Sequence, residues 1–258
     1  MRFSYLFGII FLIGITFSLN SCNEDVKKGD VDLVFKVTYG GQPLEMFKNY
    51  TYPVTGELLN FTRFAFYVAD INVKKKSNSS GQISEIKTTE IDFLNVTEAH
   101  TGSLGANGYV YTLKGIEEGE YSGLRFGLGV PPALNSKEPK DFPSSSVLSS
   151  TSNYWSVWKS YIFFRPEGKI DLKNDGTPGE GFALHLGGDS AYVPFDFTKS
   201  FIVQEGMNAR IEIEIDLEKY FNAKALYPMR SNPSIHSLEQ KAQMDILTEN
   251  LKQSVKVK

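Results

Sequence analysis

Apolar and polar side chains alternate, residue by residue, along two stretches that lie far apart in the chain. Between residues 31 and 39 every second side chain is apolar: Leu33, Phe35, Val37 and Tyr39. Between residues 209 and 217 apolar side chains alternate with carboxylates: Ile211, Glu212, Ile213, Glu214, Ile215, Asp216 and Leu217. A period of two is typical of a strand with one buried face, and the polar second face favours an antiparallel sheet with a solvated side.

Strand-like segments of the same kind recur between these two stretches. They cover residues 63–73, 86–93, 109–113, 121–130, 161–165, 182–186, 192–197 and 200–204. Residues 135–153 contain serine and proline with little apolar pattern, and they predict a long loop. Many short strands bounded by turns predict an all-β fold, which we assign to an antiparallel β-sandwich.

Helical patterns are confined to the C-terminal part of the chain. Residues 216–221 fit one or two helical turns, and residues 237–251 fit a longer helix. Ser237 and Gln240 form the Ser-x-x-Gln pattern of a capping box, and an apolar stripe with helical spacing follows. We therefore expect a short C-terminal helix packed on the sandwich, with no domain boundary after Asp30.

The amino terminus has the pattern of a secretory signal. Arg2 precedes a mostly apolar run over residues 6–17, which is shorter than the roughly 20 apolar residues that a membrane-spanning helix needs. The run leads to Leu19-Asn20-Ser21-Cys22, which resembles the lipobox of bacterial lipoproteins. The residues after the cysteine, Asn23-Glu24-Asp25, resemble the export tag of Bacteroidetes surface lipoproteins.

These patterns divide the chain into three parts. Residues 1–21 are predicted to be a lipoprotein signal peptide, residues 22–30 a tether, and residues 31–258 a single β domain. Cys22 is the predicted lipidation site, which would place the protein in the cell envelope, anchored to a membrane and facing the periplasm or the cell surface. The competing interpretation is an ordinary cysteine behind an ordinary signal peptide.

Composition excludes several classes of protein. The 258 residues include 41% hydrophobic residues, enough to bury a core. The formal net charge is −3, whereas nucleic-acid-binding proteins usually carry a basic balance, so we expect no nucleic acid as partner. A single cysteine excludes a disulfide framework and a cysteine-rich metal site.

No segment carries a recognisable catalytic pattern. The Gly-x-Ser-x-Gly and P-loop patterns do not occur, and the carboxylates of Asp196 and Glu212 belong to no catalytic motif. Residues 171–176 begin like a calcium loop, but Lys173 occupies a position that needs an oxygen ligand. We therefore expect a binding protein and not an enzyme.

Three histidines are the main residues with chemistry to offer. His100 lies in a predicted exposed loop, and we assign it no role. His185 lies in a predicted strand, and Gly187 and Gly188 after it leave room for a ligand or another backbone segment. His236 precedes the predicted C-terminal helix. Imidazole suits copper and zinc alike, and the spacing alone leaves open whether these histidines bind a metal or are structural.

Four segments, in order, resemble the MbnP family of periplasmic copper-binding proteins, which are associated with methanobactin gene clusters. They are residues 61–71, residues 119–130 with Asn135, residues 155–168 and residues 182–187. The most specific are the Tyr-x-Gly-Leu-x-Phe-Gly-Leu-Gly-Val stretch that begins at Tyr121 and the His-Leu-Gly stretch that begins at His185. The resemblance implies one β-rich domain that binds copper. In some members a partner dihaem enzyme oxidises a tryptophan to kynurenine.

The tryptophan segment departs from the family pattern Trp-x-Trp-x-x-Gly-Tyr. When the chain is aligned on Tyr161, Trp155 matches the first tryptophan, but Val157 and Ser160 replace the second tryptophan and the glycine. Trp158 is shifted by one residue. This departure leaves open whether a tryptophan is modified in this chain, and without the resemblance both tryptophans would be read as core residues.

Two functional hypotheses follow. The lipobox and the family resemblance together imply a lipid-anchored copper-binding protein; the resemblance places His185, His236 and Trp155 at the metal site and implies a dihaem cytochrome peroxidase-like partner. The alternative is a surface lipoprotein that binds carbohydrate or protein, without a metal, through exposed aromatic side chains.

Overall fold

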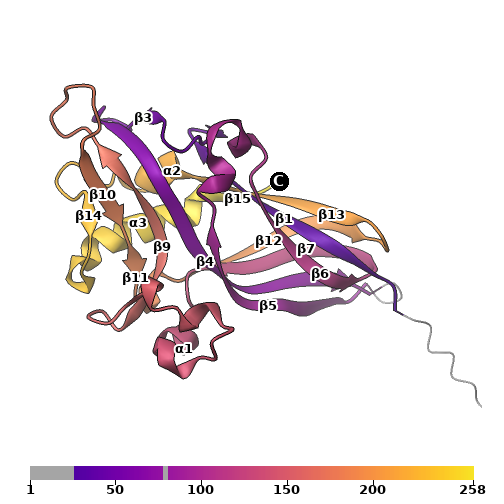
Figure 1. Ribbon diagram of the computed structural model, residues 1–258. Helices are drawn as coiled ribbons and strands as arrows, with labels where there is room; N and C mark the ends of the chain where they lie inside the picture. The colour runs from indigo at the N-terminus through magenta and orange to yellow at the C-terminus, as the bar shows by residue number, and fades with distance from the viewer. Residues whose placement is uncertain (1–25, 78–80) are drawn as a thin grey trace, which may run out of the picture.

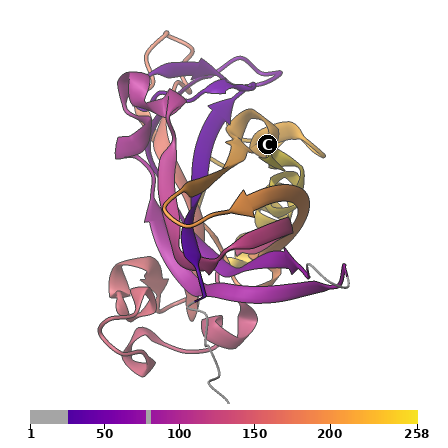
Figure 2. The same cartoon turned by 90° about the vertical axis from the view of Figure 1, so that its right-hand side faces the viewer.

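Two β-sheets face each other across the core of the protein (Figures 1 and 2). The computed structural model describes residues 26–77 and 81–258. The predicted signal peptide and the predicted lipidation site Cys22 therefore lie outside the described residues. The all-β sandwich that the alternation predicts is confirmed.

The smaller sheet is built around β1, which contains the first alternating stretch. On one side β1 pairs with β13, the second alternating stretch, and β13 pairs with β15. On the other side β1 pairs with β6 and β2. These strands span Lys28–Tyr39 (β1), Gln42–Pro43 (β2), Tyr109–Glu117 (β6), Asn208–Asp216 (β13) and Val255–Val257 (β15).

The larger sheet has the order β12–β7–β4–β9–β10–β14, because the long strand β4 pairs with β9 along its first half and with β7 along its second. The strands span Leu58–Lys76 (β4), Gly119–Leu128 (β7), Ser160–Ile170 (β9), Glu180–Leu184 (β10), Val193–Val203 (β12) and Ser234–Ile235 (β14). Four further strands pair with β4 or β9: Asn49–Thr51 (β3), Ile83–Asn95 (β5), Tyr154–Trp155 (β8) and Leu186–Gly187 (β11).

Among the strands that the structure describes, two pairs run parallel, β1 with β13 and β10 with β14, so the sheets are mixed. Alternation tells which face a side chain takes, but it says nothing about the direction of the partner strand. Parallel partners need a long crossover connection, and most of the domain lies between β1 and β13. The sandwich architecture is therefore as predicted, and these two pairings are where it departs from a purely antiparallel one.

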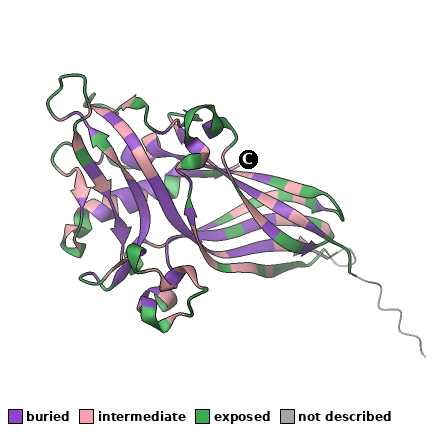
Figure 3. Cartoon of the chain, in the orientation of Figure 1, coloured by how far each residue is buried: buried purple, intermediate pink, exposed green. Residues whose placement is uncertain are grey.

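Phenylalanine rings join the two sheets at the centre of the core. The ring of Phe35 on β1 lies 5.5 Å from that of Phe66 on β4 and 6.4 Å from that of Phe126 on β7, between centroids. All three side chains are buried. Strand β4 is buried along most of its length, whereas the edge strand β5 is mostly half-buried or exposed (Figure 3). The high aromatic content of the chain thus fills the space between the sheets.

Two helices, α2 (Leu217–Asn222) and α3 (Lys241–Ser254), pack against each other (Figure 1). The predicted capping box is present, with Ser237 and Gln240 bonded to each other's main chain. It starts the 3-10 helix η7 (Leu238–Gln240), and α3 follows directly. The predicted C-terminal helix is therefore confirmed. No helix among the described residues is both long and apolar enough to cross a membrane.

Two predicted boundaries change. Strand β1 begins at Lys28, so the last three residues of the predicted tether, residues 22–30, are part of the sheet: Lys28 pairs with Glu117 and Asp30 with Asn208. The predicted long loop has local structure. It follows the helix α1 (Pro132–Asn135) and contains three 3-10 helices, η3 (Pro139–Asp141), η4 (Val147–Ser149) and η5 (Thr151–Asn153). Three more are η1 (Glu98–His100), η2 (Gly102–Ala106) and η6 (Asp189–Ala191).

His100 is buried and structural, which corrects the prediction of an exposed loop. Its Nε2 accepts a hydrogen bond of 2.9 Å from the main-chain N–H of Val37, so its Nδ1 carries the proton and donates to the carbonyl of Val96 at 2.8 Å. Burial lowers the pKa of His100, which favours this neutral form. The local sequence gave no sign of this role, because Val37 lies on a distant strand.

We expect the substitution His100→Ala to lower the free energy of unfolding by about 2–4 kcal/mol, because it leaves the buried N–H of Val37 unpaired and opens a cavity. Urea unfolding measures the effect, with Glu98→Ala, at an exposed position of the same 3-10 helix, as the matched control. Equal unfolding midpoints for the two variants would contradict the structural role of His100.

Candidate metal centre

The two histidines proposed from the sequence, His185 and His236, meet because their strands are neighbours in register. Strands β10 and β14 run parallel, with Leu184 opposite Ile235. His185 follows the last paired residue of β10, and His236 follows the last paired residue of β14. Their imidazoles lie 5.2 Å apart between ring centroids, at an interplanar angle of 83°. A local feature of the sheet thus joins two residues that no sequence motif connects.

Trp155 completes a triangle of rings. Its ring lies 5.6 Å from that of His185 and 5.2 Å from that of His236. Trp155 ends β8, which pairs with the start of β9 through a tight turn over residues 156–159. Trp158 lies on this turn, with its ring 4.3 Å from that of Trp155. The structure therefore brings together the three residues predicted for the site.

A charged network holds the ring of His185, which is buried. The Nε2 atom of His185 lies 2.8 Å from Oε1 of Glu167 on β9. The same oxygen accepts hydrogen bonds from Nε and Nη2 of Arg165, at 3.0 and 2.7 Å. Nη1 of Arg165 donates to Asn153, in the predicted long loop, at 2.8 Å. The loop thus contributes Asn153 to the network that holds the ring of His185.

The network fixes which nitrogen of His185 is available. Burial opposes ionisation of Glu167 most strongly, but the hydrogen bonds from His185 and Arg165 outweigh it and lower the pKa of Glu167 to about 2. An ionised carboxylate only accepts hydrogen bonds, so Nε2 of His185 carries the proton. Nδ1 of His185 is buried and has no hydrogen-bond partner. In the neutral ring this atom holds a lone pair that no protein group uses.

His236 differs from His185 in its exposure. Its side chain is exposed, while its main chain is held on both sides: the N–H donates to Oε1 of Gln240 at 2.8 Å, and the carbonyl accepts from Nε1 of Trp158 at 3.0 Å. Partial burial lowers the pKa of His236, His185 lowers it further, and Glu167 opposes both. The lowered pKa favours the neutral imidazole at neutral pH, and a neutral ring nitrogen can act as a metal ligand.

The donor set consists of two imidazoles. Among residues 26–77 and 81–258 no group of three or more histidine, cysteine, aspartate or glutamate side chains is placed to hold a metal ion. The nearest carboxylate, that of Glu167, is engaged by Arg165 and His185. A histidine that donates one ring N–H to a carboxylate has the arrangement by which proteins usually orient an imidazole towards a metal.

The model of the MbnP family matches residues 28–237 of this chain. The chain belongs to the MbnP family. Membership links it, at the level of the family, to methanobactin-related copper handling. Among solved structures it is similar to MbnP from Methylosinus trichosporium, with 16% sequence identity, a TM-score of 0.48, and coverage of 76% of this chain and 78% of that chain. None of the curated protein sequences compared with the chain matches it significantly.

Sequence reasoning on this MbnP family member missed the roles of Arg165 and Glu167. Both lie on β9, and Glu167 is directly opposite Ala183 on β10. Ala183 and His185 point to the same side of the sheet because side chains alternate. The signal in the sequence was an Arg-x-Glu pair, two opposite charges on one face of a strand that is otherwise buried.

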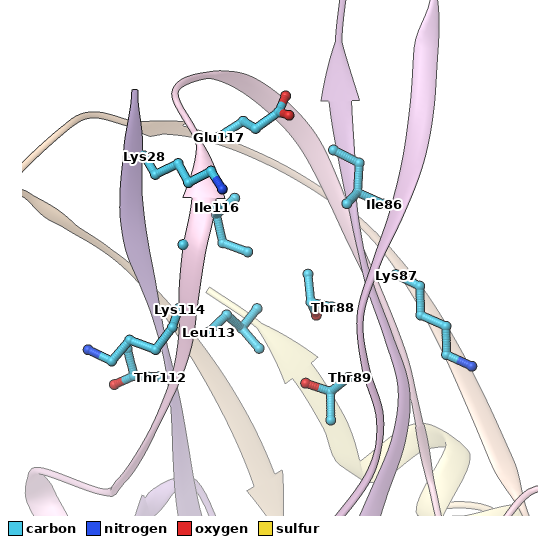
Figure 4. A pocket seen from close by; sticks show the side chains of 11 residues that line it. Lys28, Ile86, Lys87, Thr88, Thr89, Thr112, Leu113, Lys114, Ile116 and Glu117 are labelled. Atoms are coloured by element: carbon cyan, nitrogen blue, oxygen red, sulfur yellow. The ribbon is translucent and has the colours of Figure 1, made fainter. Parts of the chain in front are cut away.

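A groove lies between the edge strands β5 and β6, away from the histidines (Figure 4). This groove, of about 460 Å³, is lined mainly by lysine, threonine and aliphatic side chains, including Lys87, Thr89 and Lys114. Lys87 pairs with Asp70 and Lys114 with Asp30, so acids of the protein already partner these two lysines. None of the described residues that line the groove belongs to the histidine site.

The low pKa of Glu167 predicts how stability depends on pH. A carboxylate with a depressed folded-state pKa stabilises the protein above its unfolded value of about 4.5, and this contribution is lost as the pH falls through about 2. In the metal-free protein, Glu167→Gln should therefore flatten the loss of stability below pH 4.5. Parallel stability curves for the two proteins, measured by urea unfolding, would contradict the network.

Proposed function

We propose that this protein is a lipid-anchored, extracytoplasmic copper-binding protein and not an enzyme. The observation that carries the proposal is the buried Nδ1 of His185, which has no partner although the ring belongs to a satisfied network. A buried polar atom without a partner costs free energy, and a metal ion would remove that cost. The exposed imidazole of His236, 5.2 Å away between ring centroids, is the natural second donor.

The chemistry of the donors fits copper better than zinc. Imidazole is a good ligand for both, and divalent copper binds nitrogen sites more tightly than zinc does. Zinc sites usually have three or four protein ligands, whereas the described residues offer two imidazoles. Bound copper would supply redox chemistry, while the chain holds both rings, shields one of them from water and fixes its tautomer.

The position of the site supports a role away from a membrane surface. The start of β1 at Lys28 lies at one end of the molecule, and β10, β11 and β14 lie at the other (Figure 1). An anchor at Cys22 would therefore hold the histidine pair towards the surrounding solution. We also propose, from family membership, a dihaem cytochrome peroxidase-like enzyme as partner.

The alternative function finds less support. A module that binds carbohydrate or protein through aromatic side chains needs such side chains at its surface. Among the residues that the structure describes, Phe47 is the one exposed aromatic side chain. The groove between β5 and β6 offers lysine and threonine instead, with no aromatic ring among its described lining residues.

Substitution of either histidine should abolish tight copper retention. We expect His185→Ala and His236→Ala each to weaken copper binding by more than about 100-fold, because even residues that only orient a ligand are worth about 10–100-fold. Metal analysis of the purified protein after copper loading and desalting measures the retained copper. Glu239→Ala, an exposed neighbour of His236, is the matched control and should keep its copper. Retention of copper by His185→Ala would remove His185 from the site.

Replacement of Cys22 should release the protein from the membrane. Several acyl chains anchor a protein stably, whereas a single chain binds only marginally. We expect Cys22→Ala to move the protein from the detergent phase to the aqueous phase in a phase-partition experiment, with Ser21→Ala as the control that stays in the detergent phase. Membrane retention of Cys22→Ala would contradict lipidation at this residue.

A further inference from the structure

Trp158 joins the two segments that carry the histidines. Trp158 is buried, with an exposed fraction of 7%. The turn over residues 156–159 directs it inward: the N–H of Trp158 bonds to the carbonyl of Trp155 at 3.0 Å, and Lys159 closes the turn with a φ of 51°. This left-handed conformation is uncommon for a residue other than glycine. The turn therefore keeps Lys159 in an unfavourable backbone conformation, and it directs the side chain of Trp158 into the protein.

On one side the indole holds the main chain of His236. Nε1 of Trp158 donates to the carbonyl oxygen of His236 at 3.0 Å. The preceding strand β14 is only two residues long and lies at the edge of the sheet, so it gives His236 little support of its own. The exposed imidazole of His236 is therefore placed largely by hydrogen bonds to its main chain, one from Trp158 and one to Gln240.

On the other side the indole packs against the strand that follows His185. A Cβ atom built on Gly187 would lie 3.1 Å from Cε3 and Cζ3 of Trp158 and 2.8 Å from the carbonyl oxygen of Tyr161. Only glycine leaves room for the ring at this place. The same indole therefore contacts the backbone two residues after His185 and the backbone of His236.

We propose that Trp158 is a positioning residue: by holding the main chain of His236 against the segment of His185, it sets the separation of the two imidazoles. It acts through His236 and does not itself bind the metal, since its one polar atom is committed to the carbonyl of His236. The inference rests on the proposed copper site for its functional meaning. Its structural part holds for the metal-free protein.

The substitution Trp158→Phe tests this role because it keeps an aromatic ring and removes the N–H donor. We expect copper affinity to fall by about five- to tenfold, the size of one lost hydrogen bond. In the metal-free protein we expect faster hydrogen exchange at the amide of His236 and unchanged exchange in β4. Tyr154→Phe, in the same hairpin, is the matched control and should change neither quantity. Gly187→Ala, which displaces the indole, should reproduce the loss of affinity.

The outcomes separate this inference from the proposed function. If the unaltered protein retains copper but Trp158→Phe changes neither affinity nor exchange at His236, the positioning role is wrong and the copper site stands. If the unaltered protein retains no copper, the proposed function fails, and the exchange data still decide the role of Trp158. If Trp158→Phe does not fold, hydrogen exchange of the indole N–H of Trp158 in the unaltered protein tests the positioning role instead. Slow exchange of that proton supports the bond to His236, and fast exchange overturns it.

Discussion

The parallel pairing of β10 with β14 is the constraint on which the candidate centre depends. It joins Leu184 to Ile235 and thereby sets His185 beside His236. A slip of one residue would turn every side chain of β14 to the other face of the sheet, and the histidine pair would be lost. The register is held from outside the strand, because the carbonyl of Ser234 accepts from Gln240 and that of His236 accepts from Trp158. The capping box that starts the C-terminal helix thus also fixes the register of an edge strand.

The charged network next to His185 matters more for the orientation and tautomer of the His185 ring than for the net stability of the protein. Burying charges costs free energy, and a buried ion pair often contributes little to the net stability of a protein. Here Arg165 directs three of its nitrogens to two oxygens, one on Glu167 and one on Asn153. Held by Arg165, the carboxylate of Glu167 faces Nε2 of His185 and leaves Nδ1 of His185 for another ligand. A neutral partner in the place of Glu167 could donate as well as accept, and the tautomer would then no longer be specified.

Much of the architecture could be predicted from alternation, and the failures share one cause. The two alternating stretches, 31–39 and 209–217, became the adjacent strands β1 and β13, and the capping box at Ser237 marked the start of the C-terminal helical segment. The parallel pairings, the burial of His100 and the network at Glu167 could not be predicted from local pattern. Each depends on contacts between residues far apart in the chain, such as that of His100 with Val37. Prediction of the histidine pair needed the family resemblance, and the structure supplies the physical reason for the pair.

The two histidines differ in how they would hold an ion. His185 is buried, and its ring is fixed by a carboxylate, so it loses little conformational freedom when an ion binds. His236 is exposed, follows a strand of only two residues, and is restrained through its main chain. An incoming ligand from solution would meet His236 first and could displace it without disturbing the network at Glu167. Under the proposed function, the buried histidine therefore determines where the ion sits, and the exposed one determines how readily it is exchanged.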